Sequence, residues 1–166
     1  RYKWSSKNYY IETDIKLKMN FECINNKFTN HKISNSIISK ILNLLIKNEQ
    51  KKINSLTVII EDDEFLKELK KKYFNQDIYT DVITFNLEDK NDPIDGEIYI
   101  SLPRVIDNSK IYNSDLSQEF KRVMIHGILH LFGYEDITLN QKKEMTSLED
   151  KYINLVQESL IKSLWV

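Results

Sequence analysis

Residues 126–136 read HGILHLFGYED, and this segment constrains the local structure more than any other part of the chain. His126 and His130 lie four positions apart in an apolar, helix-forming stretch, so a helix would place both imidazoles on one face. Gly133 suits the left-handed residue that closes a helix, and two carboxylates, Glu135 and Asp136, follow the expected turn. Two helical histidines, a turn and a third donor predict a metal site with three protein ligands.

Three protein ligands leave one coordination position of zinc open, as catalytic zinc sites require. Zinc proteases with the H-E-x-x-H motif carry a glutamate beside the first histidine as general base, whereas this chain has Gly127 there. Peptide hydrolysis by that route is therefore not expected. A glycine inside a helix costs about 1 kcal/mol relative to alanine, and here it would leave room beside His126 for a substrate or a bound water. The alternative is that both histidines are packed or hydrogen-bonded side chains without a metal.

The length and composition of the chain exclude several classes of protein. With 166 residues, 41% of them hydrophobic and 30% charged, the chain fits one domain, expected over residues 15–166, after an N-terminal arm or extension over residues 1–14. The single cysteine, Cys23, excludes an internal disulfide framework and favours a reducing compartment, so we expect a cytoplasmic protein. No apolar run approaches the roughly 20 residues that span a membrane. Because the net charge is −1, any contact with nucleic acid must come from a local patch.

The periodicity of the apolar residues predicts an α+β fold, a mixed α/β sandwich whose four-stranded, mainly mixed sheet packs with about five helices. Strands are expected at residues 15–24, 56–60, 82–85 and 97–101. Helices are expected at residues 33–46, 65–73 and 103–111, from a cap at Ser114 or Asp115 into the histidine segment, and at 138–160. The turn at residues 91–96 should join the last two strands as an antiparallel hairpin. The last helix should bury Met145, Leu148, Tyr152, Leu155 and Val156.

Residues 126–136 resemble the H-G-x-L-H-L-x-G-Y-D-H signature of the YbeY family of rRNA-maturation endoribonucleases. Residues 80–85, TDVITF, are similar to the family's T-D-V-L-S-F segment, and residues 96–101, GEIYIS, are similar to its G-D-I-x-I-S segment. An apolar strand followed by the acidic residues 62–64 precedes a helix in the expected place. The resemblance extends over about residues 15–155, which is nearly all of the chain.

The resemblance implies a zinc-dependent endoribonuclease that cleaves single-stranded RNA, matures the 3′ end of the small-subunit (16S) rRNA and takes part in ribosome quality control. The implied cofactor is one Zn²⁺ ion held by His126, His130 and Asp136. The implied partners are single-stranded rRNA, the small ribosomal subunit and its assembly proteins, with no nucleotide cofactor and no membrane.

Two positions depart from the family pattern. The third metal ligand of the family is usually a histidine, and here that position is Asp136, whose oxygen also binds zinc, at about 2.0–2.2 Å. Glu135 occupies the aspartate position of the motif and is both the rival third ligand and a candidate catalytic residue. Six residues before Thr80, where the family commonly has an arginine thought to serve RNA cleavage, this chain has Phe74. Arginine recognises phosphate through its planar guanidinium, whereas phenylalanine offers packing or base stacking.

Basic residues near the expected cleft are the candidate RNA contacts. Lys70, Lys71 and Lys72 fall in the helix expected at residues 65–73. Arg104, one of three arginines, is the candidate for phosphate contact and for a catalytic role. The alternative for all four side chains is a solvated surface.

Four other residues have a structural interpretation. Asp81 is expected to be a hydrogen-bonding residue at the start of a strand, and Thr80 a turn residue. Tyr134 is expected to pack behind the metal site, with stacking on a base as the alternative. His31 is expected at the start of a helix, without a functional role.

The leading hypothesis is a metal-dependent ribonuclease whose groove is lined by the strand edge at residues 80–85 and by Arg104. A noncatalytic ribosome-assembly factor with a structural zinc site is the alternative, and a zinc hydrolase acting on a small substrate is a third hypothesis. An open metal position surrounded by basic residues would favour the enzyme, whereas a closed site with four protein ligands would favour the assembly factor.

Overall fold

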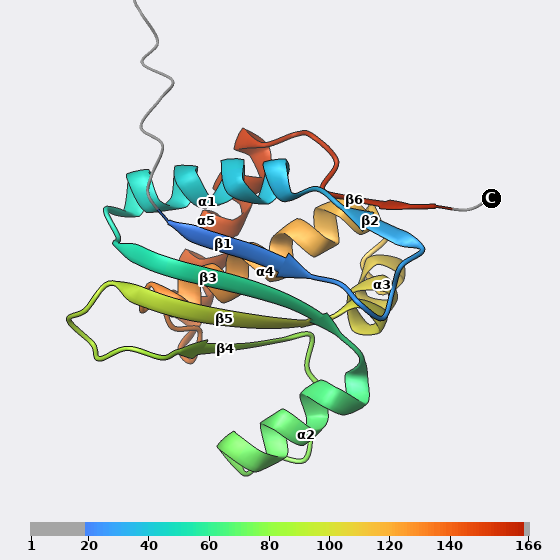
Figure 1. Cartoon of the computed structure of the whole chain (residues 1–166), viewed down its shortest axis with the longest axis horizontal. Coiled ribbons are helices and arrows are strands. Elements are labelled where there is room, and N and C mark those ends of the chain that lie inside the picture. Colours follow the sequence, from blue (N-terminus) through green and yellow to red (C-terminus); the bar gives the residue numbers. More distant parts are fainter. Residues whose placement is uncertain (1–18, 165–166) are drawn as a thin grey trace, which may run out of the picture.

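The computed structural model describes residues 19–164, in which four strands form one mixed sheet (Figure 1). The order across the sheet is β1 (Asn20–Ile24), β3 (Ile53–Glu61), β5 (Ile94–Ser101) and β4 (Val82–Asn86). β1 runs parallel to β3 and β3 runs parallel to β5, whereas the edge strand β4 pairs antiparallel with β5. The expected four-stranded mixed sheet and the expected hairpin are therefore confirmed.

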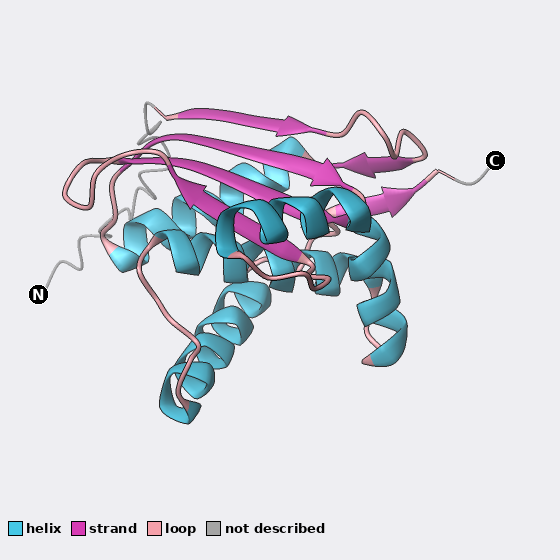
Figure 2. Ribbon diagram, turned by 90° about the horizontal axis from the view of Figure 1, so that it is seen from below, coloured by secondary structure: helices cyan, strands magenta, loops and turns pink. Residues whose placement is uncertain are grey.

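The same residues form five helices, as expected: α1 (Asn35–Glu49), α2 (Asp63–Phe74), α3 (Leu102–Ile111), α4 (Leu116–Leu131) and α5 (Leu139–Leu155). Figures 1 and 2 show α1, α4 and α5 on one side of the sheet, while α2 lies beyond the edge strand β4. Each helix begins after a polar side chain that accepts a hydrogen bond from an amide of the first turn. These N-caps are Ser34, Asp62, Ser101, Asp115 and Thr138.

The core lies between the sheet and the helices on its covered side. Alternation along β3 buries Leu56, Val58 and Ile60, and the corresponding positions of β5 bury Ile98 and Ile100. Each fully buried aliphatic side chain stabilises the fold by about 1.5–3 kcal/mol. This core holds α4 against the sheet and so fixes the position of the histidine segment.

Two glycines allow α4 to pack closely on the sheet. A Cβ atom on Gly127 would lie 3.1–3.2 Å from three methyl groups of β4 and β5, and one on Gly96 would lie 2.7 Å from Leu131 Cδ1. The expectation that Gly127 leaves room for a substrate or water is therefore wrong, because its missing side chain accommodates the strands. Gly96, expected in the turn, lies inside β5 and makes room for α4 from the other side.

Two short strands that the sequence pattern did not predict, β2 (His31–Ile33) and β6 (Ile161–Ser163), form an antiparallel pair. His31 lies in β2, so the expectation that it starts a helix is wrong. The predicted helix at residues 33–46 instead begins after the Ser34 cap and continues to Glu49. Pairing with a strand more than a hundred residues away decides the conformation of this segment.

The last helix is shorter than expected. α5 ends at Leu155, which is 51% exposed and so not on the inner face, while Val156 is buried in an extended conformation. Lys121 Nζ donates a 2.8 Å hydrogen bond to the Val156 carbonyl, and the Leu160 amide donates one of 2.7 Å to Ser117 Oγ. The segment after Leu155 is therefore held against α4 by these hydrogen bonds, and its apolar residues Val156 and Leu160 are buried although they are not helical.

The expected arm, residues 1–14, and the first part of the strand expected at residues 15–24 lie outside the described residues. Within residues 19–164, no helix is both long enough and apolar enough to cross a membrane.

Candidate metal centre

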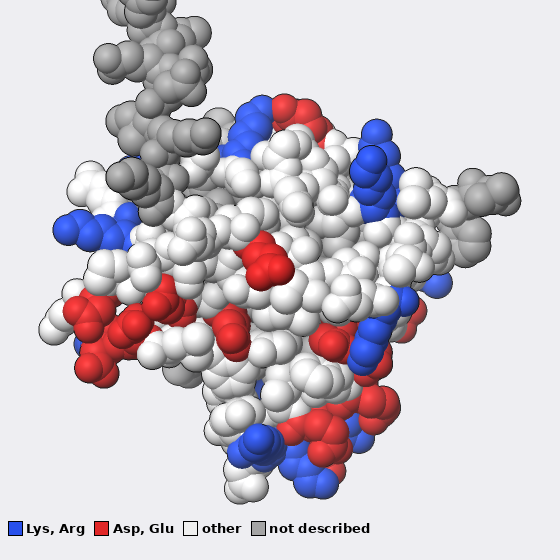
Figure 3. All heavy atoms as spheres, in the orientation of Figure 1, with Lys and Arg blue, Asp and Glu red and all other residues white. Residues whose placement is uncertain are grey.

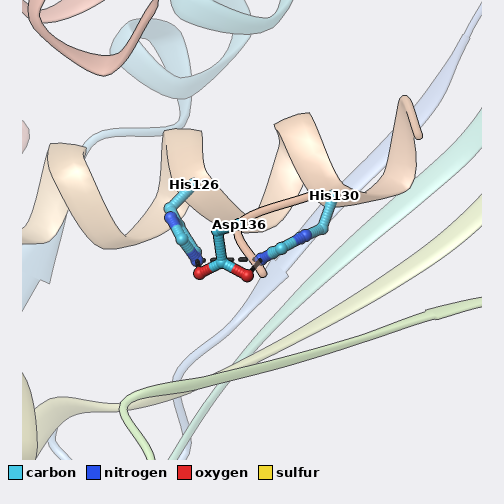
Figure 4. Close-up of side chains that lie close together, drawn as sticks. All are labelled: His126, His130 and Asp136. Carbon is cyan, nitrogen blue, oxygen red and sulfur yellow. Dashed lines mark hydrogen bonds and ion pairs between the residues drawn. The ribbon is translucent and has the colours of Figure 1, made fainter. Parts of the chain in front are cut away.

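His126 and His130 lie one turn apart on the exposed side of α4, as their spacing predicted (Figure 4). Their Nε2 atoms are 2.9 Å apart, and their ring planes meet at 86°. The neighbouring residues of α4, from Val123 to Leu129, are otherwise buried. Since the two side chains are 25% and 27% exposed, both rings are reachable from solvent.

The turn after α4 brings Asp136 under the two rings. Gly133 adopts φ +95°, and the amides of Gly133 and Tyr134 donate to the carbonyls of His130 and Leu129, each at 3.0 Å. Asp136 Oδ2 then lies 3.7 Å from Nε2 of the first histidine, and Oδ1 lies 3.8 Å from Nε2 of His130. Figure 4 shows the carboxylate facing both imidazoles.

These three side chains fit one divalent metal ion. A tetrahedral zinc ion with bonds of about 2.0–2.2 Å keeps its ligand atoms roughly 3.3–3.6 Å apart. The separations here, 2.9, 3.7 and 3.8 Å, lie on both sides of that range. Among residues 19–164, His126, His130 and Asp136 are the group of potential ligands whose donor atoms all lie within 4.8 Å of one another. Their identity as metal ligands stays a prediction.

The Nδ1 atom of each histidine has an acceptor, which fixes the tautomer. Glu149 Oε1 lies 2.7 Å from Nδ1 of His126, and the Tyr134 carbonyl lies 2.9 Å from Nδ1 of His130. Both acceptors require a proton on Nδ1, so in the neutral rings both Nε2 lone pairs point toward the Asp136 carboxylate. Two facing lone pairs and a carboxylate are suited to hold a cation.

Three carboxylates act on the pKa of His126. Burial lowers the pKa of His126, but the hydrogen bond with Glu149 and the charges of Glu149, Asp136 and Asp81 raise it more. The net shift of this pKa is upward. The same negative charges would favour a bound cation.

Glu149 is itself held in place. It lies on the buried face of α5, next to α4, and its Oε2 atom accepts a 3.0 Å hydrogen bond from Arg122 Nη1. Arg122 also donates to Asp150 Oδ1, at 2.8 Å. Arg122 precedes His126 by one helical turn, so Arg122, His126 and His130 form one partly exposed stripe on α4. Arg122 and Glu149 were not identified from the sequence as residues of the site. Arg122 lies four residues before His126, and this spacing could have indicated it; nothing in the sequence indicates Glu149.

The sequence model of the family described as Endoribonuclease YbeY matches residues 20–157, from the start of β1 to two residues after the end of α5. This chain belongs to the YbeY family. Endoribonuclease YbeY of Karelsulcia muelleri (strain GWSS) is 37% identical over 155 residues, covering 93% of this chain and 98% of that protein. Endoribonuclease YbeY of Amoebophilus asiaticus (strain 5a2) is 39% identical over 145 residues, covering 87% of this chain and 90% of that protein.

The fold of this YbeY-family chain is also found in a solved structure. The solution structure of TM1509 from Thermotoga maritima matches with a TM-score of 0.53 and 28% sequence identity, covering 83% of this chain and 88% of that one. The resemblance recognised from the histidine segment and the two strand segments is therefore confirmed.

Tyr134 braces the loop that carries Asp136. Its side chain packs against the core, as expected, and its hydroxyl donates to Glu49 at the end of α1. Tyr152 on α5 donates to the same carboxylate. Since the Tyr134 carbonyl accepts from His130, this cluster links α1 and α5 to one of the two imidazoles on α4.

A cavity of about 260 Å³ opens beside His126. It is lined by the charged residues Asp81, Glu119, Arg122 and Glu149 and by neutral side chains that include Asn108 and Tyr112. Burial raises the pKa of Asp81, and burial likewise raises that of Glu119. A larger groove of about 640 Å³ between β1 and β2 contains none of the predicted site residues. The smaller cavity is therefore the candidate for substrate access to the centre.

The two residues before β4 have the structural contacts that were expected. The Asp81 carboxylate accepts from Asn108 Nδ2 at 3.1 Å, and the Asp81 carbonyl accepts from the Ser101 amide at 2.8 Å. The Thr80 hydroxyl donates to the Val82 carbonyl at 3.2 Å.

Arg104 does not line the cavity beside His126. Its Nη2 atom lies 2.8 Å from Asp63 Oδ2, and its guanidinium lies 5.0 Å from the centre of the Tyr79 ring. These contacts join α3 to α2 and the loop that follows α2. The predicted phosphate and catalytic roles of Arg104 stay predictions, and the ion pair with Asp63 would compete with a phosphate for the same donors.

The remaining predicted site residues lie apart from the three ligand atoms. Glu135 is exposed and does not belong to the group with Asp136, so the geometry favours Asp136 as the third ligand. Lys70, Lys71 and Lys72 lie in the last turns of α2, beyond β4. Their contact with RNA stays a prediction.

Proposed function

We propose that this YbeY-family protein is a metal-dependent endoribonuclease that cleaves single-stranded RNA. Two histidine Nε2 atoms and an aspartate carboxylate converge beside an open cavity, and this convergence is the observation that carries the proposal. The name of its relatives, Endoribonuclease YbeY, supports the same reaction. The proposed biological role is maturation of the 3′ end of small-subunit rRNA and ribosome quality control, with the small subunit and its assembly proteins as partners.

In this proposal three residues hold the metal ion and two others orient the histidines. His126, His130 and Asp136 would hold one Zn²⁺ ion, which supplies Lewis-acid chemistry toward water and phosphate oxygen when bound. Glu149 keeps the proton of His126 on Nδ1, and the Tyr134 carbonyl does the same for His130. Those contacts leave both Nε2 atoms unprotonated in the neutral rings, so their lone pairs can bind the metal ion.

Charge around the centre decides how RNA can approach. Arg122 lines the cavity, and its side chain is 37% exposed and already bonded to Glu149 and Asp150. The exposed Glu135 stays a candidate catalytic residue next to Asp136. Because the cavity itself is mostly acidic, we infer that the phosphates are bound outside it, by the basic residues of α2.

A noncatalytic assembly factor with a structural zinc site is the second candidate. Structural zinc sites have four protein ligands and are closed to solvent. Within residues 19–164 the ligand group contains three side chains, which are 25–41% exposed. This exposure favours the enzyme over the assembly factor. A zinc hydrolase of small substrates, the third hypothesis, has no specific observation in its favour.

Cleavage of single-stranded and duplex rRNA fragments of equal length by the purified protein tests the proposal. We expect cleavage of the single strand, loss of cleavage after chelation and recovery when Zn²⁺ is added back. The variant with both His126→Ala and His130→Ala, purified in parallel, should be inactive and also controls for contaminating nucleases. Undiminished cleavage by that variant, or no cleavage by the metal-loaded protein, would contradict the proposal.

A further inference from the structure

The C-terminal end of α2 and the loop after it expose several large side chains. Every residue from Lys71 to Tyr79 is exposed, and Leu66 is the fully buried residue of α2. Tyr73 is 57% exposed and Phe74 is 46% exposed. Exposed apolar side chains that lie next to one another often mark a binding site.

The exposed rings are held by a half-buried ring beneath them. The centroid of Phe85, on β4, lies 5.1 Å from that of Tyr73 in an edge-on arrangement and 6.0 Å from that of Phe74 in a stacked one. Phe85 in turn contacts Tyr99 on β5, at 6.0 Å. Because the rings are fixed against the sheet, they can accept a stacked partner without losing much side-chain freedom.

The ammonium groups of two lysines lie over these rings and, among residues 19–164, have no carboxylate partner. Lys70 Nζ lies 5.1 Å from the Phe74 ring centroid, and Lys72 Nζ lies 5.0 Å from that of Tyr73. Within residues 19–164 neither lysine forms an ion pair, whereas Lys67 and Lys71 both reach one aspartate in the following loop. Figure 3 shows Lys and Arg side chains at the α2 end of the molecule, interspersed with Asp and Glu side chains.

We propose that Tyr73 and Phe74, whose rings lie under Lys70 and Lys72, form a platform on which bases of single-stranded RNA stack once these long side chains turn toward the phosphates. This inference rests on the proposed function and specifies where its substrate is held. Aromatic faces beside unpaired cations match a chain of exposed bases and phosphates, and stacking of this kind tolerates any sequence. A duplex hides the faces of its bases, so the platform selects single strands.

The platform and the metal centre lie on opposite faces of one edge strand. Val82 and Thr84 of β4 face Gly127, the residue after His126, on α4. Phe85 of the same strand faces the rings of α2. A strand of RNA that stacks on α2 and passes around the free edge of β4 would therefore approach the centre.

Fluorescence anisotropy of a labelled single-stranded 2′-O-methyl oligouridylate of about eight nucleotides measures binding to the metal-loaded protein, and a gel checks that the probe stays intact. The matched probe is an abasic oligomer with the same backbone. We expect the abasic probe to bind about tenfold or more weakly, since each stacked base contributes substantially to affinity. Equal affinity for the two probes would overturn the platform.

Substitutions test whether the preference for the probe with bases depends on Tyr73 and Phe74. Tyr73→Leu with Phe74→Leu keeps apolar bulk but removes the flat faces, and should weaken oligouridylate binding about tenfold or more while abolishing the preference over the abasic probe. The matched control is Phe65→Leu, at the other end of α2, where Lys27 is paired with Glu61 and Asp62. It should change the affinity less than about twofold.

The lysines are tested by the salt dependence of the same binding. Lys70→Gln with Lys72→Gln should lower the slope of log affinity against log salt by about 1.4, roughly 0.7 for each phosphate contact. The control, Lys142→Gln with Lys143→Gln, makes the same charge change at exposed positions of α5 and should leave the slope unchanged. An unchanged slope in the first variant would overturn the role of the two lysines.

The failures of the two proposals are distinguishable. If the protein cleaves RNA but the leucine variant binds oligouridylate as the unmodified protein does, the platform is wrong and the proposed function stands. The same result would arise if the patch bound another protein. If the metal-loaded protein neither binds nor cleaves single-stranded RNA, both proposals fail. Circular dichroism and thermal unfolding verify that each variant is folded, and the abasic comparison requires no variant.

Discussion

Glu149 on α5 and His126 on α4 are joined by a 2.7 Å hydrogen bond between a carboxylate oxygen and Nδ1, although 23 residues separate them in the chain. Arg122 holds the other oxygen of Glu149. A carboxylate in this position orients a ligand imidazole and raises its basicity. The position of His126 as a metal donor therefore depends on a helix that contributes no metal ligand of its own.

Glu149→Gln should weaken metal binding, by about tenfold to a hundredfold, because the amide no longer fixes the tautomer of His126. Competition with a chromophoric chelator measures the affinity. Asp150→Asn is the matched control, since Asp150 bonds to Arg122 but not to the histidine. If both variants retain full affinity, the carboxylate does not position the ligand.

The third ligand is tested by two neighbouring substitutions. Asp136→Ala should weaken metal binding strongly, since this carboxylate lies within 3.8 Å of both imidazoles, whereas Glu135→Ala should have a small effect. Isothermal titration of the metal-free protein with Zn²⁺ compares the two affinities directly. Equal losses in the two variants would leave the choice of Asp136 without support.

The cluster of Glu49 with Tyr134 and Tyr152 predicts a dependence of stability on pH. Burial raises the pKa of Glu49, but the two hydroxyl donors and nearby lysine charge outweigh it, so the net pKa lies below the ordinary value of 4.5. A lowered pKa means that the charged form stabilises the folded protein above this ordinary value, and that this contribution disappears as pH falls through the lowered one.

Glu49→Gln should therefore destabilise the protein near neutral pH by about 1–3 kcal/mol and have little effect in acid. Urea unfolding at a series of pH values measures this difference in free energy. Because Tyr134 also holds His130 through its carbonyl, metal affinity should fall together with stability. A destabilisation independent of pH would contradict the role of the charged carboxylate.

Gly127→Ala tests the close packing of α4 on the sheet. The new methyl group would lie 3.1–3.2 Å from Val82, Thr84 and Ile98, whose branched side chains belong to strands and cannot yield easily. Overpacking costs about 1–3 kcal/mol, against a helix-propensity gain of about 1 kcal/mol. We expect a lower melting temperature, whereas the control Ser147→Ala, at an exposed position of α5, should not lower it. A Gly127→Ala variant as stable as the unmodified protein would show that this space is not filled by packing.

Local patterns were sufficient for most of the fold and for the histidine part of the site. The four-residue spacing of His126 and His130, the turn at Gly133 and the hairpin of β4 and β5 are each determined by nearby residues. The strand pair of β2 and β6 and the end of α5 at Leu155 depend instead on contacts between distant segments. Such contacts leave no periodic signal in the sequence.

The site residues that the sequence analysis missed also depend on contacts between distant segments. Glu149 and Glu49 reach the histidine segment only because α5 and α1 pack next to it. Gly127 was misinterpreted because nothing in its own segment indicates that strands lie against it. Arg104 was expected at the cleft, but its partner Asp63 lies on a helix whose position follows from the whole sheet.

The metal content of the purified protein, measured by elemental mass spectrometry, tests the central claim most directly. The unmodified protein should contain one Zn²⁺ ion per chain, and the variant with both His126→Ala and His130→Ala should contain none. The three converging donor atoms and the two fixed Nδ1 protons predict this result. Full metal occupancy in the double variant would contradict the account.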